Sequence, residues 1–295
     1  MTAYIGRFAP SPTGPLHFGS LVSALASYLD ARSQQGTWFV RIDDIDPPRE
    51  VPGATDLILQ QLESHGLLWD REVIRQSERS AFYDEALRDL RRRNLLFACD
   101  CNRKRLAKLQ GVYDGYCRHR DLSFAADQIA WRVCVPETLP PIRFLDLFQG
   151  EQCFQLPRDS GDFVLRRKDG LYAYQLATAC DEIALGITHI IRGADLLDST
   201  PRQHYLVDLL GGQPPQYGHI PAAIAANGQK LSKQNHAPAI ESRHAGHNLH
   251  QALAWLGLSP PPDAQHAPVS TLIEWAATHW DRSLVARGAS RPAPG

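Results

Sequence analysis

The sequence has 295 residues, of which 43% are hydrophobic and 21% are charged. A chain of this length and composition can bury one large core or two ordinary ones, which excludes a small disulfide-stapled scaffold and a disordered chain. Its 31 Lys and Arg residues against 32 Asp and Glu residues give a formal net charge of -1, so a polyanionic partner would have to meet a local basic patch.

Residues 1–94 alternate short β-prone runs with amphipathic helical patterns. Strands that alternate with helices of this length indicate a parallel sheet covered by helices. We therefore predict that this stretch forms the first half of a Rossmann-like, doubly wound α/β domain. The predicted strands span residues 4–8 and 37–42, and the predicted helices span residues 19–31, 53–66 and 80–94.

The alternation stops over residues 95–170, which hold a cluster of cysteines and several β-prone runs but few helical patterns. We predict that this stretch is an inserted α+β subdomain. The pattern of strands and helices resumes over residues 171–240, which are predicted to complete the sheet domain. Strands are expected at residues 129–135, 142–148, 163–166, 188–192 and 216–220, and helices at residues 172–185 and 199–210.

The composition shifts towards Ala, His and Pro over residues 241–295. Helices are predicted there at residues 248–256 and 269–280, with the proline-rich linker 259–268 between them. The final stretch, residues 285–295, is expected to be flexible and unfolded. The sequence therefore predicts a short helical C-terminal part that ends in a flexible tail.

The chain shows neither a membrane span nor the pattern of a secretory signal. About 18 consecutive apolar residues are needed to cross a bilayer, and no run reaches that length. The N-terminal segment leads directly into a strand-like stretch. We therefore expect a cytoplasmic protein that does not associate with membranes.

A loop rich in proline and glycine, residues 7–20, joins the first predicted strand to the first predicted helix. Gly14 and Gly19 would let the backbone approach a ligand closely. At the carboxyl end of a parallel strand, the following helix offers its free amides to phosphate, and His17 adds a side-chain donor. The alternative is a simple turn in which His17 only caps the helix. Taken alone, the loop favours this alternative, because short motifs often match by chance.

A second segment, Lys230-Leu231-Ser232-Lys233-Gln234, follows more than two hundred residues later. Two lysines around a serine suit a cationic clamp on a polyphosphate, although a solvated lysine-rich turn is the alternative. Together with the first loop, the segment resembles the paired signatures of class I aminoacyl-tRNA synthetases. Residues 7–14, 41–46 and 191–196 are in addition similar to catalytic-domain signatures of the glutamyl-tRNA synthetase group, and the resemblance covers roughly residues 4–240.

Full-length members of that group carry a large anticodon-binding part, whereas only about sixty residues follow the lysine segment here. Such a chain, with its cysteine cluster, resembles closely the glutamyl-queuosine tRNA(Asp) synthetases. The resemblance implies a ligase that activates L-glutamate as glutamyl-adenylate and transfers it to queuosine at the wobble position of tRNA(Asp). A truncated glutamyl-tRNA synthetase that charges the 3′ end of tRNA(Glu), a small-molecule adenylate-forming ligase and an inactive tRNA-binding paralogue are the alternatives.

The same resemblance implies partners and site residues. The expected partners are tRNA(Asp) carrying queuosine, L-glutamate and ATP with Mg²⁺, and we expect a monomer. Each charge of a buried glutamate must be paired, so Arg7 and Arg192 are expected to bind carboxylates and Asp43 the ammonium, where the family more often has Glu. The glutamate site is expected to comprise Arg7, Phe8, Ala9, Pro10, Ser11, Asp43, Tyr174 and Arg192. The ATP site is expected to comprise His17, Gly19, Ser20 and Lys233, and the catalytic residues are expected to be His17, Gly19, Lys230 and Lys233.

Three cysteines, Cys99, Cys101 and Cys117, lie within the predicted insertion. Three soft sulfur ligands favour structural Zn²⁺ over Mg²⁺ or Ca²⁺, although chance clustering of reduced cysteines is the alternative. Residue chemistry alone favours His119 as the fourth ligand, whereas the resemblance implies Tyr113. The other three cysteines lie in apolar runs and are expected in the core: Cys134, Cys153 and Cys180.

Ten basic residues lie near the cysteine cluster in the sequence, and only a few acids lie in the same stretch, residues 88–120. A solvated helix face is the usual explanation of such a run. With a polyanionic substrate, we expect some of these side chains to contact tRNA phosphates, which would make binding salt-dependent. They are Arg88, Arg91, Arg92, Arg93, Arg103, Lys104, Arg105, Lys108, Arg118 and Arg120.

Overall fold

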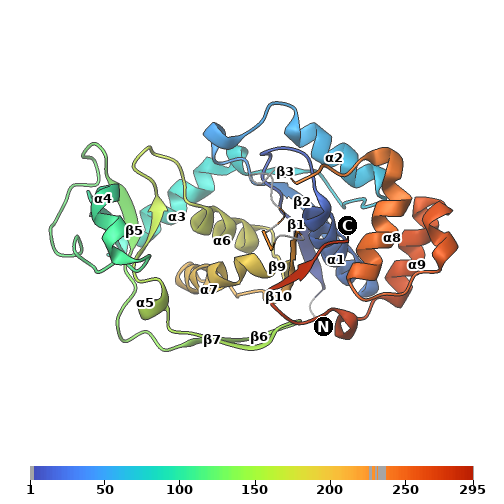
Figure 1. Cartoon of the computed structure of the whole chain (residues 1–295). Helices are drawn as coiled ribbons and strands as arrows, with labels where there is room; N and C mark the ends of the chain where they lie inside the picture. The colour runs from blue at the N-terminus through green and yellow to red at the C-terminus, as the bar shows by residue number, and fades with distance from the viewer. Residues whose placement is uncertain (1–2, 226–227, 230, 232–236, 295) are drawn as a thin grey trace.

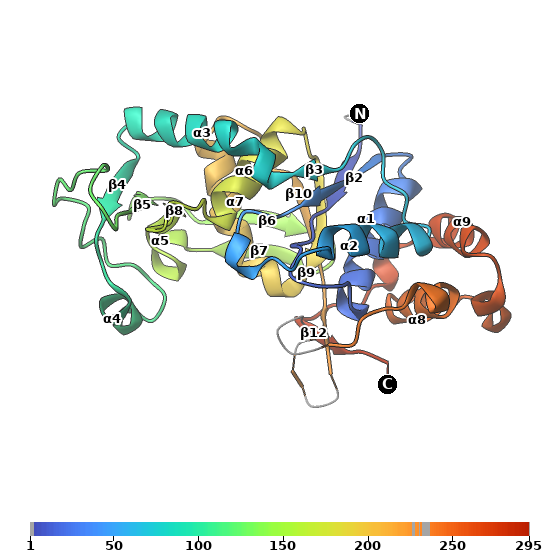
Figure 2. The same cartoon turned by 90° about the horizontal axis from the view of Figure 1, so that it is seen from above.

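The computed structural model describes residues 3–225, 228–229, 231 and 237–294. Its centre is a parallel β-sheet between two layers of helices (Figures 1 and 2). β1 (Ile5–Phe8) pairs in parallel with β2 (Thr37–Ile42), and β2 pairs in parallel with the short β3 (Ile74–Arg75). All residues of β2 after the first are buried, as expected for a strand that is covered on both faces.

The second half of the sheet comes from a distant part of the chain. β9 (His189–Gly193) pairs in parallel with β10 (Gln216–Ile220). β9 lies beside β1: the N–H of Thr188, the residue before β9, donates to the Ile5 carbonyl at 2.9 Å. The strand order is therefore β3-β2-β1-β9-β10, and the predicted parallel sheet is confirmed.

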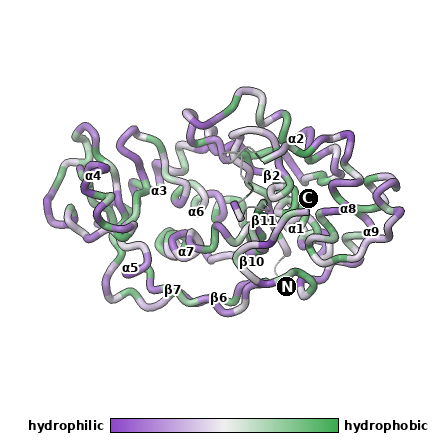
Figure 3. Tube along the Cα trace, in the orientation of Figure 1, coloured by the Kyte–Doolittle hydropathy of each residue, from purple (hydrophilic) through white to green (hydrophobic). Residues whose placement is uncertain are grey.

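Helices cover both faces of this sheet (Figure 1). On one face, α1 packs against α8 and α9, and Figure 3 shows apolar residues concentrated where these helices meet the strands. On the other face, α6 and α7 pack against each other and α3 packs against α6. The helices are α1 (Phe18–Ser33), α2 (Ala54–Ser64), α3 (Ser80–Arg92), α6 (Tyr174–Ala184), α7 (Thr200–Leu209), α8 (Ala245–Trp255) and α9 (Val269–His279).

The segment between α3 and α6 forms an antiparallel sheet in the order β4-β5-β8 and a separate β6–β7 hairpin. The hairpin returns to the main sheet, where the Leu147 N–H donates to the Tyr217 carbonyl at 2.9 Å and Phe148 is buried. The elements are β4 (Leu96–Cys99), α4 (Arg103–Leu106), β5 (Ala130–Val133), β6 (Ile142–Asp146), β7 (Gly150–Phe154), α5 (Leu156–Asp159) and β8 (Phe163–Arg166).

The C-terminal tail differs from the prediction, because it folds. β12 (Ser290–Pro292) pairs in parallel with β11 (Ala222–Ile224). The Trp255 indole N–H donates to the Pro292 carbonyl at 2.7 Å, and Val285 is buried. The composition of the tail gave no sign of this strand, because its order comes from backbone pairing with a distant segment rather than from an apolar face of its own.

Short 3₁₀ turns connect several of these elements. One of them lies within the predicted linker 259–268, and another precedes α7. They span Pro47–Arg49, Gln76–Arg79, Ala107–Leu109, Ala194–Ser199, Ser242–His244, Pro262–His266 and Arg282–Leu284. Among the described residues, no helix is both long enough and apolar enough to cross a bilayer.

Candidate active site

A cavity of about 430 Å³ opens at the carboxyl ends of β1 and β9. Its walls come from the loop after β1, the first turn of α1, the start of α6, the end of β9 and β11. The structure thus brings together both predicted sets, apart from Asp43 and the lysines. The predicted residues that line this first cavity are Arg7, Phe8, Ala9, Pro10, Ser11, His17, Gly19, Ser20, Tyr174 and Arg192.

His17 is the N-cap of α1 and also part of the cavity wall. Its Nδ1 accepts from the Ser20 N–H at 3.3 Å, and the Ser20 hydroxyl oxygen accepts from the His17 N–H at 2.8 Å. This reciprocal pair is a capping box, which fixes the start of the helix. A Cβ on Gly19 would lie 3.2 Å from the His17 ring and 3.4 Å from the Ala223 Cβ, so a glycine keeps this corner of the cavity open. His17 therefore caps α1 and lines the cavity at the same time.

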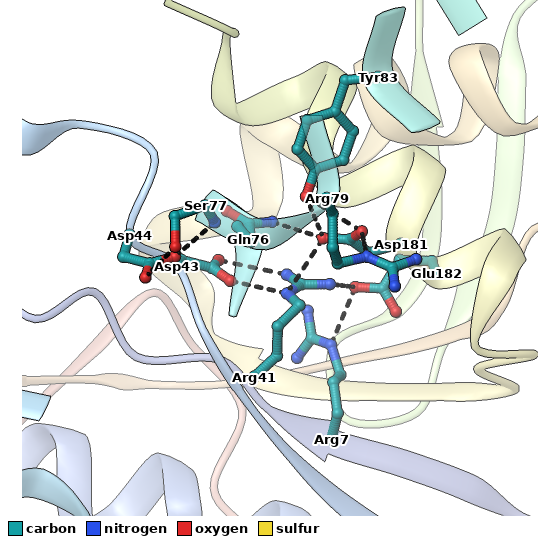
Figure 4. Close-up of polar contacts among 10 residues, drawn as sticks. All are labelled: Arg7, Arg41, Asp43, Asp44, Gln76, Ser77, Arg79, Tyr83, Asp181 and Glu182. Carbon is teal, nitrogen blue, oxygen red and sulfur yellow. Dashed lines mark hydrogen bonds and ion pairs between the residues drawn. The ribbon is translucent and has the colours of Figure 1, made fainter. Parts of the chain in front are cut away.

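Arg7 lies in the cavity wall with most of its donors available. The side chain is buried, and its Nε–H donates to Glu182 Oε1 at 3.0 Å (Figure 4). Within the described residues, the two terminal nitrogens of Arg7 have no hydrogen-bond acceptor. They form a planar fork that suits a carboxylate.

A buried network of charges lies directly behind Arg7 (Figure 4). Arg41 is fully buried and donates to both oxygens of Asp43, at 2.7 and 3.2 Å, and to Glu182 at 3.2 Å. Asp181 in turn ion-pairs with Arg79 at 2.6 Å. Burial alone would raise the pKa of Glu182, but the Arg7 and Arg41 guanidiniums hold that pKa below its usual range. The network therefore keeps Glu182 ionised as a fixed anchor for Arg7.

Asp43 occupies a different place from the one predicted. It does not line the first cavity, and both of its carboxylate oxygens accept from Arg41. Burial raises the pKa of Asp43 against the opposing effect of Arg41. Asp43 instead lines a second cavity of about 750 Å³. This second cavity shares Ala9, Ser11, Thr13, Tyr174 and Leu196 with the first.

Arg192 is held by a buried relay that the sequence did not reveal. Its Nε–H donates to His219 Nε2 at 3.0 Å, and its terminal nitrogens donate to Gln203, Thr200 and the Leu196 carbonyl. Because Nε2 accepts, the proton of neutral His219 is on Nδ1, which donates to Asp146 at 2.5 Å. Burial and the Arg192 guanidinium lower the pKa of His219, although Asp146 opposes them. The relay keeps the imidazole neutral and the guanidinium in one orientation.

The cysteine cluster has the geometry of a metal site. The Sγ atoms of Cys99, Cys101 and Cys117 lie within 4.8 Å of one another and are buried. The Tyr113 hydroxyl lies 3.5 Å from the Sγ atoms of both Cys99 and Cys101. His119 is exposed and does not belong to this group in the part of the chain that the structure describes. The donors that meet are thus three thiols and one phenol, a set that fits Zn²⁺ better than a hard cation.

Most of the chain, including the residues of the first cavity, matches a known protein family. Residues 5–260 match the catalytic domain of the class I tRNA synthetases for glutamate and glutamine ("tRNA synthetases class I (E and Q), catalytic domain"). The chain belongs to this family.

Within this family, curated relatives match nearly the whole chain. A Pseudomonas fluorescens protein named glutamyl-Q tRNA(Asp) synthetase is 50% identical over 99% of this chain and 96% of its own length. A protein of the same name from Pseudomonas aeruginosa is 49% identical over 99% of this chain and 98% of its own length. A relationship this close also places the chain among the glutamyl-Q tRNA(Asp) synthetases as a family.

Solved structures show the same fold at lower sequence identity. A glutamate tRNA ligase from Elizabethkingia meningosepticum, in complex with its amino acid, has a TM-score of 0.81 and 23% identity, and the match covers 99% of this chain and 67% of that one. The glutamate-tRNA synthetase of Elizabethkingia anophelis has a TM-score of 0.80 and 24% identity, with 98% and 68% covered. The chain therefore has the catalytic-domain fold of class I synthetases.

The two predicted lysines and the three cysteines outside the cluster differ in where the structure places them. Lys230 and Lys233 lie outside the described residues, whereas Leu231 between them lines the first cavity. Cys180 is buried as expected, but Cys153 is exposed, because it lies on the β6–β7 hairpin, whose residues alternate in burial. Cys134 is intermediate.

The basic residues near the cysteine cluster are less isolated than predicted. Several of them form ion pairs with acids that are distant in sequence or one helical turn away. Among the residues that the structure describes, Arg88 and Arg91 on α3 and Arg103, Lys104 and Lys108 in the insertion have no ion pair. The pairs are Arg92 and Arg93 with Asp89, Arg105 with Asp114, Arg118 with Asp162, and Arg120 with Asp100.

Proposed function

We propose that this chain activates L-glutamate with ATP and transfers the glutamyl group to the queuosine base of tRNA(Asp). One observation carries the proposal: a single cavity joins the Arg7 fork and Arg192 to His17, Gly19 and the first turn of α1. Such a cavity can hold a dicarboxylic amino acid beside the phosphates of a nucleotide. The names of the curated relatives supply the acceptor.

In the first step, a carboxylate oxygen of glutamate attacks the α-phosphate of ATP, and the bond to pyrophosphate breaks. This reaction needs positioning and neutralisation of phosphate charge more than it needs a general base. Arg7 would bind one carboxylate as a fork, and Arg192 would bind with its one uncommitted N–H. The amides at the start of α1 and the His17 ring would face the phosphates, with Lys230 and Lys233 assigned to them from the sequence alone. Mg²⁺ bound with ATP would neutralise further phosphate charge.

The amino acid and the acceptor can be tested separately. We expect ATP–pyrophosphate exchange that depends on glutamate and not on glutamine or aspartate, measured with and without tRNA. A preference for glutamine or aspartate would contradict the assignment of the glutamate site. We further expect that glutamate on charged tRNA(Asp) survives removal of the 3′ nucleosides. Loss of the label with those nucleosides would indicate a shortened glutamyl-tRNA synthetase instead.

We also propose that Cys99, Cys101, Cys117 and Tyr113 hold one structural Zn²⁺. Three buried sulfurs and a phenol that meet at one point support this ligand set. When bound, the ion would tie β4 to the segment around Tyr113 and would supply no group to the reaction. The assignment favours Tyr113 over the exposed His119.

The zinc proposal predicts metal content and stability together. Cys117→Ser should lose the metal and lower the free energy of unfolding of the insertion by several kcal/mol, because binding of structural zinc is coupled to folding. His119→Gln should keep one zinc per chain, measured by atomic emission. Loss of zinc in His119→Gln with retention in Tyr113→Phe would reverse the assignment of the fourth ligand.

The domain boundaries, the cytoplasmic location and the monomeric state stay predictions from the sequence. So does the contact of tRNA phosphates with the basic insertion, which the unpaired Arg103, Lys104 and Lys108 support.

A further inference from the structure

The second cavity meets the first at the place where activated glutamate must lie. The two cavities share Ser11 and Tyr174, and the phosphate-binding start of α1 lines only the first. Glutamate held by Arg7 would direct its reacting carboxylate towards those phosphates. An acceptor hydroxyl that enters from the second cavity can therefore reach the acyl carbon without displacing the nucleotide.

The charges of the second cavity favour a cation. Asp46 ion-pairs with Arg49 at 2.5 Å and with Arg167 at 3.3 Å. Glu50 lines the same cavity, and no ion pair of Glu50 occurs within the described ranges. Partial burial and the nearby carboxylates of Asp44 and Asp46 raise the pKa of Glu50. A positively charged group beside Glu50 would relieve this repulsion.

The remaining walls of the second cavity suit a flat base. They include the aromatic residues Tyr172 and Tyr174 and the apolar residues Pro12, Ile45 and Leu196. A volume of about 750 Å³ leaves room for a base with a bulky substituent. Aromatic rings and apolar side chains are the surfaces on which proteins receive bases taken out of an RNA loop.

We propose that the second cavity receives the modified base of the acceptor and that Glu50 binds the cationic amine of its side chain. Queuosine carries a cyclopentenediol on a secondary amine, which is protonated at neutral pH, so cation and hydroxyls enter the cavity together. This inference rests on the proposed function and names the site of its second substrate.

The walls beyond the second cavity suit the RNA backbone. Arg167 lines both the second cavity and a third one of about 480 Å³, where it pairs with Asp169 at 2.6 Å. Arg103, Arg132 and Lys168 also line the third cavity and give it an excess of positive charge. Carboxylates repel phosphates and cations attract them, so the base would enter the acidic cavity while the phosphates stay on the cationic side. The third cavity is also lined by Cys99 and Cys101, so the proposed zinc site borders the surface proposed here for the RNA backbone.

In the transfer step, a hydroxyl oxygen of the cyclopentenediol attacks the acyl carbon of glutamyl-adenylate. A carbon–oxygen ester bond forms, and the bond between the acyl carbon and the phosphate oxygen breaks. AMP leaves with the electron pair of that bond, and the hydroxyl proton passes to a phosphate oxygen of AMP. No further reactant is required.

Glu50→Gln tests the proposal, because it removes the negative charge and keeps the size. The dissociation constant is measured, without ATP, for tRNA(Asp) carrying queuosine and for the same tRNA carrying guanosine, which lacks the amine. The wild-type chain should prefer the queuosine form, and Glu50→Gln should lose about fivefold of that preference. Glu274→Gln on α9 is the matched control, since it makes the same charge change at an exposed site away from the cavities.

Two results would overturn the proposal. An equal preference for queuosine in the wild type and in Glu50→Gln would show that Glu50 does not bind the amine. In pyrophosphate exchange, Glu50→Gln could instead change the KM for glutamate or for Mg²⁺ by as much as it changes tRNA binding. That result would assign Glu50 to the activation of glutamate rather than to the binding of the base. Failure of the proposed function is separate, because the wild-type chain would then lack glutamate-dependent exchange or would charge the 3′ end.

Discussion

Arg7 and Arg192 line the same cavity but differ in how many donors the protein already uses. Arg192 commits four of its five N–H groups to His219, Gln203, Thr200 and Leu196. Arg7 commits one N–H, to Glu182. Arg7 therefore has the free donors for a bidentate pair with a ligand carboxylate, whereas Arg192 has one N–H left to offer.

This difference predicts the effect of a conservative change at Arg7. Arg7→Lys keeps the charge but loses the planar fork, so the KM for glutamate in pyrophosphate exchange should rise about 100-fold. The KM for ATP should change much less. Arg158→Lys, at an exposed position on α5, is the control and should behave as the wild type. An unchanged KM for glutamate in Arg7→Lys would exclude Arg7 as the fork.

Buried histidines predict how stability depends on pH. Burial lowers the pKa of His65, His189 and His219 from the ordinary value of 6.5. The unfolded chain then binds more protons than the folded chain once the pH falls below about 6.5, so stability is lost towards acid pH. Each fully shifted histidine can contribute up to about 1.4 kcal/mol per pH unit.

Thermal unfolding between pH 7.5 and 5.5 measures this loss. The midpoint should fall with pH in the wild type and should fall less steeply in His65→Gln, which removes one buried imidazole. His266→Gln, at an exposed position, should keep the wild-type slope. A slope in His65→Gln as steep as that of the wild type would show that His65 does not contribute.

The sequence predicted much of this site but not the groups that orient it. The loop around His17 and the stretch around Arg192 carry local signatures that can be read directly. Arg41 and Glu182 are 141 positions apart, and no local pattern joins them. A single arginine inside the buried strand β2 and two acids within the largely apolar helix α6 were the available signals. A charge in a buried element requires a partner, but it does not identify that partner.

At the scale of elements, periodic segments were predicted well and paired segments were not. α2, α3 and α9 occur within two residues of their predicted ends because each has its own apolar stripe. β12 has no such stripe and depends on β11 and Trp255. Strand pairing between distant segments is a property of the fold rather than of local sequence.

Removal of β12 tests its link to the active site. Deletion of residues 286–295 leaves the edge of β11 and the Trp255 indole N–H without their partners, while Ala222 and Ala223 of β11 line the first cavity. We expect a loss of a few kcal/mol in the free energy of unfolding and a larger rise in the KM for ATP than for glutamate. Deletion of residues 294–295 alone is the control. Equal effects on both substrates would indicate general destabilisation instead.

For the whole molecule, a net charge of -1 conceals an uneven distribution. Acids neutralise many arginines around the cysteine cluster, and the cations that have no ion pair in the described part of the insertion include Arg103, Lys104 and Lys108. These three side chains are the better candidates for phosphate contacts, rather than the full basic run that composition suggested.

The salt dependence of tRNA binding tests this choice. The double variant Arg103→Gln and Lys104→Gln should reduce the slope of log affinity against log salt by about 1 to 2, because each phosphate contact releases about one counterion. Arg243→Gln, next to Glu241 outside the insertion, should leave the slope unchanged. An unaltered slope in the double variant would place the RNA backbone elsewhere.

The long separation of β1 from β9 along the chain also has a consequence for the order in which the molecule folds during synthesis. β1 needs β9 as its neighbour, yet the ribosome makes 180 residues between Phe8 and His189. At 5 to 20 residues per second, the unpaired edge of β1 waits roughly 9 to 36 s. β11 is made later but waits for a shorter time, roughly 3 to 13 s, because 65 residues separate Ile224 from Ser290 of its partner β12. The part of the first cavity wall that β11 forms therefore gains its pairing strand only after the rest of the wall has been synthesised.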